Sequence, residues 1–162
     1  MKLVGQTGEY LVAAELGRRG LIATTFTGNV PDYDIIASTE KGKHISVQVK
    51  TIRGSTWQFG NIDKFVEIEF EGQAQIVREK RPSPVKDLVF VFVKLGSYGT
   101  DRFFICTWLE LCDVLSQHHS AYLAKHDGVR PKKWDSLHTA MKVKDISHFE
   151  DRWDLIEDML EG

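Results

Sequence analysis

The sequence predicts an α/β protein in which helices pack on the faces of a mixed β-sheet. Three patterns lead to this prediction. Residues 5–19 carry apolar side chains at helical spacing. Two stretches, 33–52 and 87–107, each hold two apolar runs around a short polar segment with glycine, which is typical of hairpins. From residue 108 onward helical spacing returns, interrupted by one short β-segment.

The first half of the chain is expected to form one helix and then three strands. In order, these elements are helix 5–19, strand 21–26, loop 28–31, and strands 33–37 and 44–52 joined by a turn at 40–43. Gly20 follows the helix and is expected to end it, because glycine readily takes the left-handed conformation found at helix C-termini. The polar turn at 40–43 contains Gly42, which favours a hairpin connection.

The second half is expected to return from strands to helices. In order, its elements are strand 65–70, a basic loop at 78–86, strands 87–95 and 102–107 joined at 96–99, a helix from Trp108, a short β-segment and a final helix. The apolar face of the helix from Trp108 is formed by Trp108, Leu111, Cys112, Leu115 and Tyr122. The final helix repeats this pattern with Phe149, Trp153, Ile156 and Leu160.

Composition predicts one soluble domain spanning residues 1–162. The chain is 42% hydrophobic and 27% charged, as ordinary globular proteins are. No apolar run reaches the roughly 18 residues of a membrane helix, and no signal-peptide pattern begins the chain, so we expect a cytoplasmic protein. Cys106 and Cys112 lie among apolar residues and are expected to be buried free thiols. The formal net charge of −2 argues against binding to nucleic acid through bulk charge alone.

Polar groups gather where two predicted strands meet. In the strand 44–52, side chains alternate between faces, so Gln48 and Lys50 share one face and the Val49 carbonyl lies between them. Asp34 stands at the start of the neighbouring strand. Carboxylate and carbonyl oxygens suit hard cations such as Mg²⁺. Glu9 falls inside the apolar stripe of the first helix, where a carboxylate is costly unless it is paired or near a metal.

Three short motifs follow one another along the first 51 residues. They are Gly8-Glu9 with Ala13-Ala14, then Tyr33-Asp34-Ile35-Ile36, then Gln48-Val49-Lys50-Thr51. In their order and spacing, these motifs resemble the PD-(D/E)XK nuclease superfamily. The last motif has a glutamine in place of its first acid. In this respect the chain resembles a branch that includes Mrr-type restriction enzymes and some intron-encoded homing endonucleases. The resemblance implies a restriction endonuclease-like three-layer core and metal-dependent hydrolysis of phosphodiester bonds in DNA.

The resemblance also implies a role for each residue of the candidate site. The metal, Mg²⁺ with Mn²⁺ as a substitute, would be held by Asp34, Gln48, the Val49 carbonyl and Glu9. Lys50 would orient or activate water and steady the charge on the phosphate. Asp32 forms a literal Pro-Asp pair with Pro31, but Asp34 directly precedes the apolar run, so Asp32 is expected to be a turn residue. A homodimer or a higher homo-oligomer would supply two such sites for the two DNA strands.

Two basic clusters are candidate contacts to the phosphates of nucleic acid. They consist of Arg78, Lys80, Arg81 and Lys86, and of Lys125, Arg130, Lys132 and Lys133, the last beside Trp134. The six histidines show no metal-ligand spacing and are expected to lie at the surface or in hydrogen bonds. No phosphate-binding glycine loop or dinucleotide motif indicates an organic cofactor. Two alternatives stay open: a catalytically weak or inactive DNA-binding module of the same fold, and an interaction or immunity-type protein that does not bind nucleic acid.

Overall fold

The structure, a computed structural model, describes residues 2–161, and the chain divides into two compact units. The first unit contains the residues up to Ser55, residues Ser83–Trp108, and those from Ile146 on. The second contains Thr56–Pro82 and Leu109–Asp145. The expectation of one domain over residues 1–162 stays a prediction. Within residues 2–161, no helix has the length and apolar character needed to cross a bilayer.

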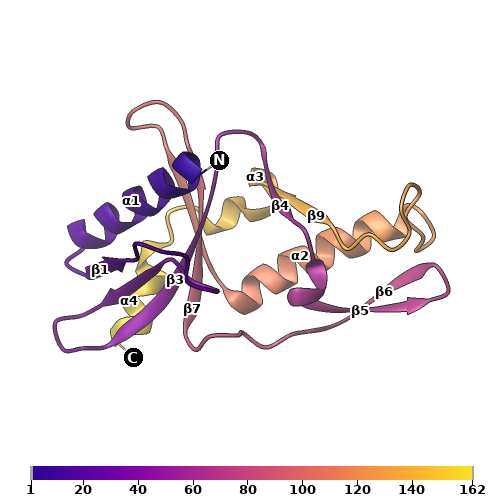
Figure 1. The fold of residues 1–162 in the computed structure, drawn as a ribbon, viewed down its shortest axis with the longest axis horizontal. Helices are drawn as coiled ribbons and strands as arrows, with labels where there is room; N and C mark the ends of the chain where they lie inside the picture. The colour runs from indigo at the N-terminus through magenta and orange to yellow at the C-terminus, as the bar shows by residue number, and fades with distance from the viewer. Residues whose placement is uncertain (1, 162) are drawn as a thin grey trace. The chain divides into compact units, whose positions relative to one another are not determined.

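A five-stranded mixed sheet forms the centre of the first unit (Figure 1). In the order in which they lie side by side, its strands are β1 (Ile22–Thr25), β2 (Ile35–Ser38), β3 (His44–Ile52), β7 (Leu88–Lys94) and β8 (Arg102–Thr107). β3 and β7 pair in parallel, and every other neighbouring pair is antiparallel. The predicted mixed sheet with flanking helices and its two hairpins, β2–β3 and β7–β8, are therefore confirmed.

The first helix, α1 (Lys2–Arg18), ends as its sequence predicted. Gly20 has a φ of +84°, and its N–H donates to the Gly17 carbonyl at 3.0 Å. The N–H of Leu21 donates to the Leu16 carbonyl, also at 3.0 Å. These two bonds form a Schellman motif, which satisfies carbonyls that a helix C-terminus leaves without partners. The motif turns the chain from α1 directly into β1.

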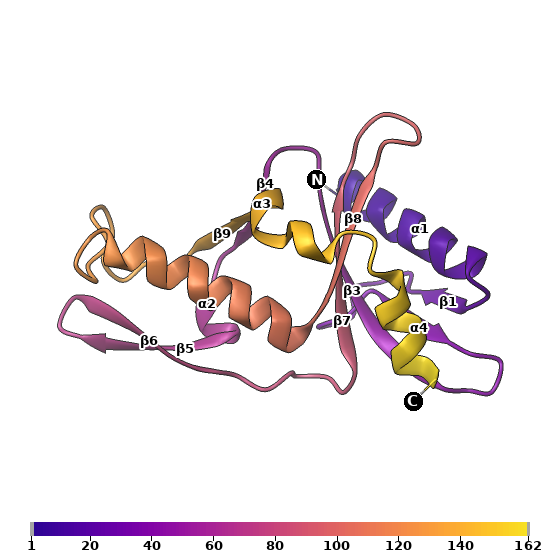
Figure 2. The same cartoon turned by 180° about the vertical axis from the view of Figure 1, so that it is seen from behind.

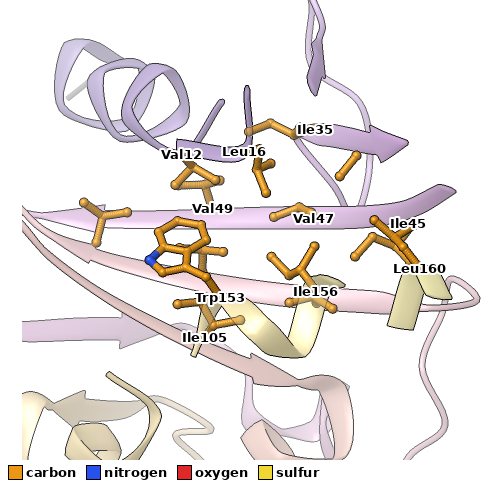
Figure 3. Close-up of a cluster of buried hydrophobic side chains, with 14 of the residues drawn as sticks. Val12, Leu16, Ile35, Ile45, Val47, Val49, Ile105, Trp153, Ile156 and Leu160 are labelled. Carbon is orange, nitrogen blue, oxygen red and sulfur yellow. The ribbon is translucent and has the colours of Figure 1, made fainter. Parts of the chain in front are cut away.

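Two helices pack on the same face of this sheet (Figure 3). Val12 of α1 and Ile156 of α4 (Trp153–Glu161) are both fully buried in one cluster with Val47 and Val49 of β3. Alternate residues of β3 supply this core, because side chains of a strand point in turn to opposite faces. Burial of apolar side chains at about 25 cal/mol per Å² is the main stabilising contribution here.

The second unit is built around α2 (Trp108–Ala124), most of which belongs to it. Two small antiparallel sheets, β4–β9 and β5–β6, lie on opposite sides of this helix in both views (Figures 1 and 2). Their strands are β4 (Thr56–Phe59), β5 (Val66–Glu71), β6 (Ala74–Lys80) and β9 (Thr139–Lys142). The remaining short elements are η1 (Ile62–Lys64), α3 (Val143–Ile146) and η2 (Ser147–Phe149). The apolar face predicted for α2 is buried, with Tyr122 only half-buried.

Three sequence-based expectations need correction. β4 and β6 were not predicted, and the basic segment 78–86 is not all loop, because Arg78 and Lys80 belong to β6. Phe149 does not lie in the final helix: it is part of η2, and Asp151, with a φ of +56°, separates it from α4. The predicted free thiols are confirmed, since Cys106 and Cys112 are both buried and unbridged.

Candidate functional site

Asp34 is fixed at the N-terminal end of β2, directly before the first residue of that strand. Its main-chain N–H donates to the Val47 carbonyl at 2.8 Å. Its side-chain Oδ2 accepts from the Val49 N–H, also at 2.8 Å. β2 begins one residue later, where Ile35 pairs with Val47. The Asp34 carboxylate therefore takes the place beside Val49 that a further residue of β2 would fill.

Three consecutive residues of β3 present different polar groups next to this carboxylate. The Val49 side chain belongs to the core, so Gln48 and Lys50, both half-buried, project to the opposite face of the sheet. The N–H and C=O of one strand residue point toward the same neighbouring strand. Because the Val49 N–H is bonded to Asp34, the Val49 carbonyl points to the side of β3 that faces β2. An amide, a carbonyl oxygen and an ammonium group thus flank the start of β2.

Glu9 reaches this region from α1. Val12 and Leu16, three and seven residues further on, are fully buried, so the half-buried Glu9 lies on the same side of the helix. The preceding residue, Gly8, is buried against Thr51 of β3: a Cβ added to Gly8 would lie 1.8 Å from Thr51 Oγ1. The absence of a side chain at Gly8 therefore lets the helix approach β3 at the turn that carries Glu9.

Electrostatics couple these groups to one another. Burial raises the pKa of Asp34, while the hydrogen bond from Val49 and the positive charge of Lys50 act in the opposite direction. Burial also raises the pKa of Glu9, and the negative charge of Asp34 raises it further. Desolvation disfavours the charged form of a carboxyl group, and a second carboxylate adds repulsion. The site is thus a pair of partly desolvated acids with one lysine acting on it.

The oxygen ligands available to a cation at this site are of several kinds. Among residues 2–161, no group of three His, Cys, Asp or Glu side chains is placed to hold a metal ion. The candidate oxygen donors are the carboxylates of Glu9 and Asp34, the Gln48 amide and the Val49 main-chain carbonyl. The Gln48 side chain projects from the face of the sheet opposite to the one on which α1 packs. Mg²⁺ binds carboxylate and other neutral oxygens and keeps several of its waters. The donor set therefore fits a hard divalent cation, with fewer negative charges than three acids would supply.

Asp32 occupies a turn. It is exposed and has a φ of +70°, a left-handed conformation that aspartate adopts more readily than most residues do. The loop that contains it connects β1 to Asp34. Its position agrees with the turn assignment made from the sequence.

A pocket beside Glu9 was not anticipated from the sequence. Its volume is about 410 Å³, and it lies between α1 and the loop that follows β1. Its lining residues are Gln6, Glu9, Tyr10, Thr25, Phe26, Thr27, Gly28 and Asn29. The sequence shows two aromatic residues, Tyr10 and Phe26, the second close to Gly28, and nothing more that could have indicated this pocket. Both aromatic side chains are exposed in the structure.

The two basic clusters differ in their ion pairs. In the first, Arg78 pairs with Glu69 at 2.7 Å, Arg81 pairs with Asp63 at 3.0 Å, and Lys80 pairs with Asp113. These partners offset much of the charge that the cluster could offer to phosphates. In the second cluster Lys125, Lys132 and Lys133 are exposed, and no ion pair to them is found within residues 2–161. Arg130 is half-buried, and its contacts are described below.

The mixed sheet and its helices define an α/β protein of nuclease-like fold. A solved structure with this fold is that of a bacterial homing endonuclease, I-Ssp6803I. The two share 13% sequence identity over 99% of this chain and 93% of that chain, with a TM-score of 0.51. At this identity the likeness shows a common fold. No protein-family model and no curated protein matches the sequence.

Proposed function

We propose that the protein is a divalent-cation-dependent endonuclease of the PD-(D/E)XK type that hydrolyses phosphodiester bonds in DNA. The observation that carries the proposal is the hydrogen bond of 2.8 Å from the Val49 N–H to the Asp34 carboxylate. It joins the two motifs in space, and the charge of Asp34 raises the pKa of Glu9 while the charge of Lys50 acts to lower the pKa of Asp34. The likeness of the fold to a homing endonuclease supports the same class of reaction.

In this proposal Asp34, Glu9, Gln48 and the Val49 carbonyl hold the cation. When bound, Mg²⁺ or Mn²⁺ supplies Lewis-acid polarisation of the phosphate and of water. The Lys50 ammonium group stabilises negative charge as it develops on the phosphate oxygens, at a preorganised position next to the carboxylate. Glu9 would bind the cation directly or hold a water molecule bound to it.

The first test is cleavage of supercoiled plasmid with Mg²⁺ or Mn²⁺. The wild-type protein is expected to nick or linearise the plasmid. Lys50→Ala is expected to lower the rate by about 100-fold or more, as loss of one stabilising donor does in other sites. Binding of DNA by the variant, measured in Ca²⁺, should persist. Equal cleavage by the wild type and Lys50→Ala would show that another site or a contaminant cuts the DNA.

Linear product would favour the homodimer, because two strands then require two sites.

A second prediction concerns stability and the metal. Since the pKa values of Asp34 and Glu9 are raised, these groups contribute stability at low pH that is lost as the pH rises through the raised values. A bound cation offsets the two negative charges above that range. At a concentration of about 100 times Kd, Mn²⁺ should add about 2.7 kcal/mol, or roughly 5–10 °C in Tm, near pH 7.

The same Mn²⁺ titration should have a smaller effect near pH 4 than near pH 7, because the raised pKa values of Asp34 and Glu9 shift both carboxyl groups toward their protonated forms as the pH falls. Melting curves with Na⁺ at matched ionic strength are the control. An equal rise in Tm at pH 4 and pH 7 would contradict a site made of these carboxylates.

A third prediction separates the basic clusters. The double variant Lys132→Gln/Lys133→Gln should lower the slope of log Kobs against log salt by about 2, since each phosphate contact contributes roughly 0.9. Arg78→Gln makes the same kind of charge change but removes a residue already paired with Glu69, so its slope should match the wild type. Fluorescence anisotropy with labelled duplex DNA in EDTA measures both. Equal slopes for all three proteins would mean that neither lysine contacts phosphate.

The second candidate function is a DNA-binding module without catalysis. The amide at Gln48, together with the absence within residues 2–161 of three acid, histidine or cysteine ligands in one group, favours weak metal binding. Salt-dependent DNA binding by a protein that shows no cleavage and no rise in Tm with Mn²⁺ would support this alternative.

A further inference from the structure

A pocket in the second unit has no role in the site described above. It has a volume of about 200 Å³ and lies between α2, the connection that follows α2, and β9. Its lining residues are His118, His119, Tyr122, Arg130, His138, Thr139 and Ala140. One arginine and three imidazole rings thus meet in a pocket whose lining contains no carboxylate. This composition is suited to an anion.

The guanidinium group of Arg130 is held in place by two contacts. Its Nη1 donates to the His138 main-chain carbonyl at 2.7 Å, and its Cζ lies 5.0 Å from the centre of the Tyr122 ring. A guanidinium has five N–H donors in a rigid fork, and the bond to His138 uses one of them. An arginine fixed in this way loses little conformational entropy when it binds a planar or tetrahedral oxyanion.

The histidines are also oriented by named partners. The amide nitrogen of Gln75 donates to the carbonyls of Trp134 and Ser136, so its Oε1 must accept from His119 Nε2, at 2.9 Å. In the same way, the Gln58 amide donates to Thr56. Its Oε1 therefore accepts from His138 Nε2 at 2.6 Å. The rings of His119 and His138 are thus fixed at the pocket wall before any ligand binds.

The electrostatics of the pocket act in the same direction. Burial lowers the pKa of His119 to about 4, and the positive charges of Arg130 and His118 contribute. Burial, the larger cause, disfavours a charge of either sign, whereas the positive charges of Arg130 and His118 disfavour only a further positive charge and attract a negative one. Outside the lining, Asp145 Oδ2 lies 3.9 Å from His118 Nδ1 and accepts from the Lys142 N–H at 2.8 Å. This carboxylate is thus near one of the three histidines but does not line the pocket.

We infer that this pocket binds a phosphate group, with Arg130 as the main donor and His118 and His138 beside it. The phosphate could belong to the backbone of a DNA strand or to a free phosphate or nucleotide, because both present the same oxygens. The inference does not require that the protein cleaves DNA. It assigns to His118, His138 and Tyr122 a role that their spacing in the sequence did not indicate.

Imidazole resonances of the full chain, followed by NMR during titration with inorganic phosphate, test the inference. Saturable shifts of the His118 and His138 rings are expected, and chloride at matched ionic strength should not produce them. Arg130→Gln should weaken phosphate binding about tenfold or more, since a charge-assisted hydrogen bond is lost. Lys64→Gln removes an exposed charge of the same unit that does not line the pocket, and this variant should bind phosphate as the wild type does.

Two further arms complete the experiment. If Arg130→Gln melts early because the His138 carbonyl loses its donor, His118→Ala serves instead and should weaken binding several-fold. A duplex oligonucleotide that displaces phosphate from the histidine resonances identifies DNA as the source, whereas phosphate shifts that persist with DNA bound identify a small phosphate ligand. Shifts that do not saturate, or that are equal in wild type, Arg130→Gln and His118→Ala, would overturn the inference. Cleavage is not measured, so loss of nuclease activity leaves this result standing.

Discussion

Replacing Asp34 by asparagine is expected to reduce the rate of plasmid cleavage by at least about 100-fold without unfolding the protein. The amide oxygen of asparagine can still accept from the Val49 N–H, which now donates to Asp34 Oδ2 at 2.8 Å. The negative charge, however, is lost. Residues that only support metal ligands cost 10- to 100-fold when they are changed, so loss of a direct ligand should be at or beyond the upper end of that range.

Thermal melting of the same variant gives a second, independent readout. Burial raises the pKa of Asp34, so its charged form destabilises the folded state near neutral pH in the absence of a cation. The side chain introduced by Asp34→Asn carries no charge, and the Tm of this variant without metal should equal or exceed that of the wild type. The rise in Tm that Mn²⁺ gives the wild type should be largely absent.

Asp32→Asn is the matched control, because it makes the same chemical change two residues earlier in an exposed turn. This variant should cleave and melt as the wild type does. A wild-type cleavage rate for Asp34→Asn would show that Asp34 is not the principal metal ligand. A loss of cleavage in Asp32→Asn alone would show that Asp32 has this role instead.

Local patterns were enough to predict the parts of the fold that depend on neighbouring residues. Gly20 ends α1 because its left-handed φ and the two bonds that follow are properties of a short segment. The hairpins β2–β3 and β7–β8 follow from apolar runs around short turns. The strand β3 could also be assigned two faces from its alternation alone, which placed Gln48 and Lys50 together.

Strands with weak alternation could not be predicted in the same way. β6 contains Arg78, Glu79 and Lys80, and two prolines follow it closely, so the segment has the composition of a loop. Its pairing with β5 joins exposed polar side chains, including the ion pair between Arg78 and Glu69. Such a strand is defined by its partner rather than by burial of its own side chains.

Contacts between distant parts of the chain were also beyond the sequence. The Asp34 carboxylate meets the N–H of a residue 15 positions away, and His119 meets Gln75 across 44 positions. Spacing indicated that Asp34 and Lys50 would lie on neighbouring strands. It could not reveal that the carboxylate accepts a hydrogen bond from the main chain of β3 or that Gln75 would fix a histidine in a pocket.

The close approach of α1 to β3 leads to the second large expected effect, that of Gly8→Ala. A Cβ at this position would lie 1.8 Å from Thr51 Oγ1 and 2.8 Å from Thr51 Cβ. Neither atom is at the end of a long side chain, so the helix or the strand must move. Overpacking of this kind costs about 1–3 kcal/mol, and the upper end corresponds to a fall in Tm of roughly 6–12 °C.

Cleavage should fall as well, even at temperatures where Gly8→Ala is fully folded. Glu9 follows Gly8 directly, so a helix displaced from β3 carries its carboxylate away from Asp34. A displacement of about 1 Å can cost 100-fold in rate. Single-turnover cleavage, measured well below the Tm of the variant, separates this loss from unfolding.

Two glycines of the same helix provide the controls. A Cβ on Gly5 or Gly17 would meet nothing within 4 Å. Alanine there should leave cleavage unchanged and add up to about 1 kcal/mol of stability, because alanine favours helix more than glycine does. In the double variant Gly8→Ala/Thr51→Gly the obstructing side chain is removed, and part of the lost cleavage should return. If Gly8→Ala melts and cleaves like Gly5→Ala, the contact with Thr51 does not position Glu9.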